Sequence, residues 1–69
     1  MSVARITEIS SSSEKSFEDA VTRGVARATE TIRNVRSAWI KEQEVQIKDE
    51  KISEYKVIMK TTFVLDDAA

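Results

Sequence analysis

The clearest hydrophobic pattern in the chain has the period of a helix. Apolar or small residues recur at spacings of three and four, at Phe17, Ala20, Val21, Gly24, Val25, Ala28, Ile32 and Val35. This spacing places them on one face of an α-helix. Ser16 precedes the pattern and is expected to cap it, with Asp19 three residues later in the manner of a capping box. The pattern predicts a helix over about residues 16–35, buried on one side only.

Gly24 is the only glycine of the chain and lies within this apolar face. A glycine inside a helix costs about 1 kcal/mol relative to alanine. We expect it there because it lets the helix lie close to a sheet or to another helix. A hinge at Gly24 is the alternative.

The period changes to two near the C-terminus. Odd positions are apolar or threonine, namely Tyr55, Val57, Met59, Thr61, Phe63 and Leu65, whereas even positions are mostly polar. This alternation predicts a strand over about residues 52–65 with one face on a core. Ile58 and Val64 interrupt the polar row, so the other face is expected to be covered in places.

A strand is also expected over about residues 36–47, but its pattern changes phase. Its apolar residues occupy even positions in the first half (Ala38, Ile40) and odd positions in the second (Val45, Ile47). A β-bulge within residues 41–44 explains the change. Alternatively, the two halves face different neighbours, the first an adjoining subunit and the second the helix.

The remaining segments complete a β-α-β-β order. Residues 2–10 are rich in β-branched side chains and predict a strand, and the run Ser10–Ser13 is expected to form a turn into the helix. The polar run Lys48–Lys51 predicts a hairpin without the glycine of a tight turn. An all-antiparallel sheet then requires the last strand to lie in the middle. The expected fold is α+β, one domain over residues 1–69 in which a three-stranded antiparallel sheet wraps around one helix.

Composition narrows the function classes. The chain has no cysteine and no histidine, which removes disulfides, ordinary zinc ligands, a histidine base and a cysteine nucleophile, so we expect no enzyme. The net charge is −1 without a basic patch, and no apolar run has the length of a signal peptide or membrane span. We therefore expect a cytoplasmic protein without nucleic-acid or membrane partners. One helix leaves the second sheet face uncovered, which predicts self-association.

The helix segment SFEDAVTRGVARATETIRNV and the closing strand YKVIMKTTFVLDD resemble the dodecin family, over essentially the whole chain. The most specific feature is the end of the helix segment, where Arg27, Ala28, Thr31, Ile32, Asn34 and Val35 follow the pattern RA-x-x-T-(I/V)-x-N-(V/L). The resemblance implies a hollow shell of twelve identical subunits, with each helix on the concave face of its own sheet. It also implies binding of FMN or riboflavin, whose rings stack in pairs between tryptophans and glutamines at a subunit interface. Such a protein stores or buffers flavin.

Two positions that the family uses for flavin differ in this chain. In register with the family, the stacking tryptophan falls on Ser37 and the stacking glutamine on Lys56. The acidic residue that contacts the flavin side chain falls on Glu42, and a position that is often basic in bacterial members falls on Glu44. Trp39, two residues after Ser37, lies on the same face of the strand and roughly 6 to 7 Å along it. The candidate cofactor-binding residues are Ser37, Trp39, Glu42, Glu44 and Lys56.

Several of these residues have a second interpretation. Trp39 either stacks on a flavin in a shifted pose or anchors a subunit interface, where aromatic residues are enriched. Lys56 either forms a solvated ion pair with Glu42 or Glu44, contributing less than about 1 kcal/mol, or meets a phosphate or a reduced flavin. A further hypothesis is an oxygen-rich cation site that forms when subunits assemble, from the carboxylates Glu42, Glu44, Asp66 and Asp67. The leading hypothesis is flavin binding, and the alternative is a flavin-free shell that binds another small ligand or cations such as calcium.

Overall fold

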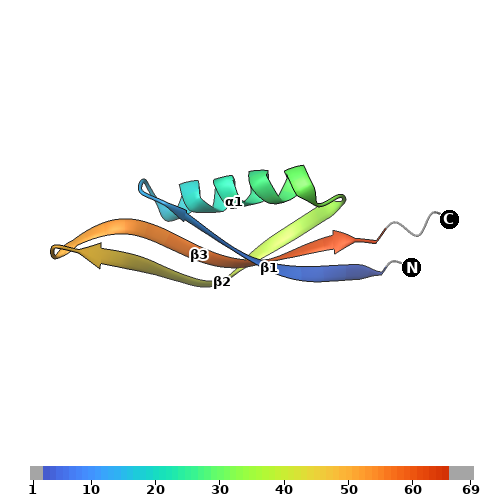
Figure 1. Cartoon of the computed structure of the whole chain (residues 1–69). Coiled ribbons are helices and arrows are strands. Elements are labelled where there is room, and N and C mark those ends of the chain that lie inside the picture. Colours follow the sequence, from blue (N-terminus) through green and yellow to red (C-terminus); the bar gives the residue numbers. More distant parts are fainter. Residues whose placement is uncertain (1–2, 66–69) are drawn as a thin grey trace.

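Three strands and one helix make up the computed structural model, which describes residues 3–65. They are β1 (Ala4–Ser13), α1 (Phe17–Thr31), β2 (Val35–Lys48) and β3 (Lys51–Val64). The strands form one antiparallel sheet in the order β1-β3-β2, and α1 lies across one face of it (Figure 1). The predicted α+β fold, with the last strand in the middle of the sheet, is confirmed.

The core lies between α1 and the sheet face that it covers, which we call the inner face; the opposite side is the outer face. Val57, Met59 and Thr61 of β3 have no exposed surface. On the helix, the small residues Ala20, Gly24 and Ala28 are buried against them. Four half-buried side chains complete the cluster: Ile9, Phe17, Val21 and Val25. The apolar rows predicted for the helix and for the last strand therefore meet in one core.

Gly24 marks the closest approach of α1 to the sheet. A Cβ atom at this position would lie 2.6 Å from Met59 Cε and 3.0 Å from Ser11 Cβ. The first distance is shorter than real Cβ atoms show and the second is tighter than most of their contacts, and Gly24 lies well inside a continuous helix. The close approach predicted for this glycine is confirmed.

β1 continues through the serine run, where the sequence pattern predicted a turn. Ser10–Ser13 lie directly opposite β3 residues from Ile58 back to Tyr55, so the turn prediction is wrong. Pairing with the central strand outweighs the modest strand propensity of serine. The serines also serve the packing, because the small Ser11 leaves the space that Gly24 approaches.

The N-terminus of α1 is fixed by side-chain hydrogen bonds. Ser16 Oγ accepts a hydrogen bond from Asp19 N at 2.9 Å, which confirms the predicted cap. Asp19 Oδ2 accepts a hydrogen bond from the buried Ser13 Oγ at 2.6 Å and lies 2.8 Å from Arg23 Nε. The bond from Ser13 is the main cause that lowers the pKa of Asp19 below its ordinary value of 3.8, and the charges of Arg23 and Lys15 act in the same direction.

α1 ends at Thr31, four residues before the predicted end. Ile32 is already extended, and Asn34 has a φ of 61°, in the left-handed region that asparagine tolerates. Asn34 O accepts a hydrogen bond from Val64 N at 3.0 Å, which ties this connection to the end of β3. Ile32 and Val35 thus continue the helical spacing in the sequence, but they belong to the connection and to β2.

β2 contains the predicted bulge. Its pairing with β3 shifts between Ile40 and Glu42, at Lys41. Ala38 and Ile40 before the bulge, and Val45 after it, all lie opposite odd-numbered residues of β3, which face inward. Ala38, Ile40 and Val45 therefore share the inner face, as a bulge predicts. Ile40 is still 42% exposed, so the alternative in which the first half faces an adjoining subunit stays a prediction.

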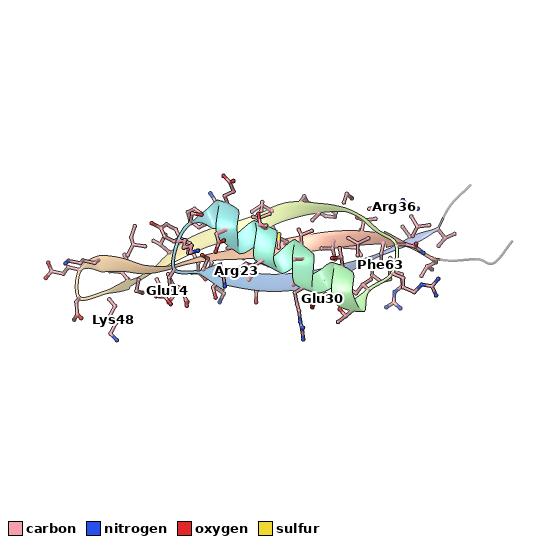
Figure 2. All side chains as sticks on the ribbon, turned by 90° about the horizontal axis from the view of Figure 1, so that it is seen from above. Glu14, Arg23, Glu30, Arg36, Lys48 and Phe63 are labelled. Atoms are coloured by element: carbon pink, nitrogen blue, oxygen red, sulfur yellow. The ribbon has the colours of Figure 1, made fainter. Side chains whose placement is uncertain are left out.

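The β2–β3 hairpin extends beyond the helix. Lys48 pairs with Lys51 across a two-residue turn, in which Asp49 and Glu50 have φ values of 52° and 64°. The predicted hairpin is confirmed, and its turn is tight although it lacks glycine. Figure 2 shows Lys48 at the tip, well past Glu14, which lies close to the start of α1.

The elongated chain leaves much of its surface uncovered. Its Cα radius of gyration is 14.4 Å, against about 11 Å for a compact domain of this length. Its accessible surface is 5348 Å², against about 4,400 Å² for a compact monomer of this mass. Among the described residues, no helix has the length and apolar character needed to cross a membrane.

Candidate functional site

All five candidate residues lie on the outer face. Val57, Met59 and Thr61, three odd-numbered residues of β3, are buried under α1, so the even-numbered residues of this strand point the other way. The pairs across β2 and β3 are Ser37 with Thr62, Trp39 with Lys60, Glu42 with Ile58, and Glu44 with Lys56. Directly opposite residues of an antiparallel pair point to the same side of the sheet. The register therefore places the five candidates on the face that α1 does not cover.

The bulge at Lys41 makes this arrangement possible. Trp39 and Glu42 are three residues apart, and in a regular strand they would point to opposite faces. The extra residue shifts the alternation by one position. The stacking candidate and the acidic candidates thereby come to one surface.

A hollow of about 280 Å³ brings three of the candidates together. It is lined by Glu42, Gln43, Glu44, Lys56 and Ile58. Lys56 Nζ lies 3.8 Å from Glu44 Oε1, which confirms the predicted ion pair for this glutamate. Both side chains are well exposed, so the pair contributes less than about 1 kcal/mol.

Trp39 lies beside this hollow without lining it. Its side chain is 45% exposed, with Lys60 directly opposite on β3. Ser37 follows on the same face, opposite Thr62. A large aromatic ring that is left half open on a sheet face offers a flat apolar surface for stacking or for packing.

Two further residues belong to the site although the sequence pattern did not single them out as site residues. Gln43 lines the hollow although it lies opposite the inward-facing Val57, and only its position between two candidate glutamates pointed to it. Lys60 lies opposite Trp39. The alternation of the last strand already assigned Lys60 to the polar row, but only the register shows that Trp39 is its neighbour.

The site can bind through stacking on Trp39, through carboxylates that accept hydrogen bonds, and through lysine ammonium groups. Within residues 3–65, no group of three or more carboxylates is placed to hold a metal ion. The other two acidic candidates for a cation site, Asp66 and Asp67, lie outside the described residues.

Comparison with known proteins identifies the family. The Dodecin family model matches residues 3–66. The solved dodecin from Streptomyces davaonensis is 30% identical with a TM-score of 0.91, and the match covers 96% of this chain and 97% of that chain. A mutant of the Thermus thermophilus dodecin is 28% identical with a TM-score of 0.90, over 97% of this chain and 100% of that chain.

A more distant structure has the same fold. The calcium-chelating dodecin from Mycobacterium tuberculosis is 24% identical with a TM-score of 0.82, over 99% of this chain and 97% of that chain. At this identity the likeness concerns the fold alone. No curated protein matches the chain. The family model and the Streptomyces structure agree over nearly the whole sequence, and the chain belongs to the dodecin family.

Proposed function

We propose that this chain assembles with copies of itself into a homododecameric shell that binds FMN or riboflavin on the outer face. The observation that carries the proposal is the half-exposed Trp39 ring on a sheet face that α1 leaves open. The flat isoalloxazine ring gains from offset stacking on an indole ring. Membership of a family with known flavin binders favours a flavin over other flat ligands.

Each candidate residue has a distinct role in this proposal. Trp39 takes over the stacking that the family resemblance assigns to the position of Ser37, and the small Ser37 side chain leaves room beside the ring. Glu42 carries no ion pair in the described chain and accepts hydrogen bonds from the hydroxyls of the flavin side chain. Glu44 and Lys56 hold one another at the far side of the hollow.

The proposed role is storage in the cytoplasm, with no reaction catalysed. A bound flavin supplies a light-absorbing and redox-active ring, while the residues of this chain bind it and orient it. Stacking on Trp39 covers one face of the flavin ring.

Self-association is supported by the shape of the single chain. The accessible surface exceeds that of a compact monomer by roughly 1,000 Å², which is about the area that one partner contributes to an interface of standard size. Light scattering is expected to give about 94 kDa, twelve times the chain mass of 7.8 kDa. A stable monomer at micromolar concentration would contradict the assembly.

Flavin titration of the ligand-stripped assembly tests the binding role. Saturable quenching of flavin emission is expected for the wild-type protein, strongly weakened by Trp39→Ala and partly retained in Trp39→Phe. Ile47→Ala is the control, because it also removes an exposed large apolar side chain but at the hairpin. Equal flavin affinities of Trp39→Ala and the wild-type protein, at unchanged mass, would exclude Trp39 as the platform.

The second candidate function is a flavin-free shell that binds another small ligand or a cation such as calcium. The presence of Ser37 and Lys56 at the family's stacking positions favours it, as do Glu42 and Glu44 beside the hollow. Lys56 argues against cation binding, since the ammonium group of Lys56 lies 3.8 Å from Glu44 Oε1, where a cation would bind. Calorimetric titration with calcium chloride separates the two. Uptake of calcium that Glu42→Gln weakens would support the second function, whereas no uptake is expected for a flavin site.

A further inference from the structure

The outer face has a cationic part next to Trp39. Lys41 reaches from the bulge of β2 to β1, where its Nζ lies 3.3 Å from Glu8 Oε1. Lys60 lies on β3 between them, opposite Glu8 on one side and opposite Trp39 on the other. Two lysines therefore lie beside one carboxylate, which within the described part of the chain pairs with Lys41 alone, and the local charge balance is positive.

The charge balance in the hollow is negative. Glu42 and Glu44 face it together with a single cation, Lys56. That cation is already engaged by Glu44. A phosphate group placed there would meet an excess of negative charge, which disfavours it.

Lys60 is the lysine that remains available on this surface. Within residues 3–65, no carboxylate forms an ion pair with Lys60, whereas Lys41 and Lys56 are both paired. Its side chain is half-buried, so its charge is screened less than that of a fully exposed lysine. An ammonium group in this position gains most from a negatively charged ligand.

We infer that Lys60, rather than Lys56, binds the phosphate of a flavin stacked on Trp39, so that the site selects FMN over riboflavin. The inference rests on the proposed function and adds the chemical form of the ligand. Opposite residues of a strand pair have Cβ atoms about 4.5–5.5 Å apart, so the flexible Lys60 side chain extends alongside whatever stacks on Trp39. FMN differs from riboflavin by this phosphate alone, and riboflavin offers Lys60 no charge.

Dissociation constants for FMN and riboflavin, measured on the assembled protein and four variants, test the inference. Lys60→Gln is expected to weaken FMN binding about tenfold or more, the effect of losing a charge-assisted hydrogen bond, and to change riboflavin binding less than about twofold. Lys60→Arg is expected to restore the preference for FMN. Lys56→Gln is expected to change the two affinities by the same factor. Lys48→Gln, which removes the same charge at the hairpin tip, is the control.

Ionic strength gives a second readout. Higher salt is expected to weaken FMN binding by the wild-type protein, with little effect on riboflavin and little effect on Lys60→Gln. The inference is overturned if Lys60→Gln weakens both flavins equally, if Lys56→Gln is the variant that abolishes the preference, or if the wild-type protein binds both flavins equally well. In these cases the flavin-binding function stands, whereas a wild-type protein that binds neither flavin overturns both.

Discussion

The two faces of β3 differ in what covers them. On the inner face, Val57 and Met59 have no exposed surface beneath α1. On the outer face, Ile58 and Lys60, one position away along the same strand, are only half-buried and have no covering element. Alternation of side chains along a strand is enough to give one element these two environments. α1 thus covers the middle of one face of β3, and no element of the described chain covers the other.

Truncating one core side chain is expected to reveal the largest difference in stability between the two faces. Met59→Ala leaves a cavity under α1 and is expected to lower the free energy of unfolding by about 2–5 kcal/mol. Ile58→Ala, the adjacent outer-face residue, is the matched control, with an expected loss under about 2 kcal/mol. Denaturant unfolding at one fixed protein concentration measures both. Equal losses would show that the outer face is as closely packed as the core.

Gly24→Ala tests how tightly α1 lies on the inner face. The new Cβ would meet Met59 Cε at 2.6 Å and Ser11 Cβ at 3.0 Å. The methyl group of Met59 must turn aside from its position in the core, and Ser11 must give by a few tenths of an ångström. We expect a net loss of about 1 kcal/mol, despite the higher helix propensity of alanine. Thr22→Ala, at an exposed position of the same helix, is expected to be neutral or slightly stabilising, and a more stable Gly24→Ala protein would contradict the close approach.

Acid is expected to weaken the attachment of α1 to β1. The pKa of Asp19 is lowered in the folded protein, chiefly by the hydrogen bond from Ser13. The contacts of Asp19 therefore stabilise the fold at pH values above the pKa that Asp19 has in the unfolded chain. This contribution is lost as the pH falls through the lower pKa of Asp19 in the folded protein, below about pH 4. Asp19→Asn is expected to be less stable than the wild-type protein at neutral pH and to lose less stability on acidification. Parallel pH profiles of the two proteins would contradict this role, and Ser13→Ala is expected to lie between them.

The smallest effect on stability is expected for the ion pair between Lys56 and Glu44 beside the hollow. A double-mutant cycle of Lys56→Gln and Glu44→Gln is expected to give a coupling energy under about 1 kcal/mol, because both groups are exposed at a separation of 3.8 Å. Denaturant unfolding of the four proteins measures it. A coupling above about 2 kcal/mol would show that a neighbouring subunit shields this pair from solvent.

Much of the fold could be predicted from the sequence, because the apolar residues recur with the clear periods of a helix and of a strand. The helical spacing from Phe17 to Ala28 and the alternation of β3 predicted the two layers of the core, and the phase change in β2 predicted the bulge at Lys41. The ends of elements were less predictable. Ser10–Ser13 form strand through pairing with β3, and the helix ends at Thr31 through contacts of Asn34 with the end of that strand. Both depend on residues far away in the sequence.

The site was predictable only in part for the same reason. Trp39 and the acidic residues could be selected from the sequence, and their common face follows once the bulge is placed. The role that we infer for Lys60 could not be predicted from the sequence, because it depends on which lysines the carboxylates of other strands already bind. Glu8 on β1 pairs with Lys41 on β2, and this contact joins residues 33 positions apart.

The most direct test of the outer face as a ligand surface is the emission of Trp39 in the ligand-stripped assembly during titration with FMN. Trp39 is the only tryptophan of the chain, so its emission reports on this position alone. Stacking predicts quenching that saturates together with the quenching of flavin emission. Trp39 emission that stays unchanged while FMN is bound would place the flavin elsewhere, and unchanged emission of both groups would show that this shell does not bind flavin.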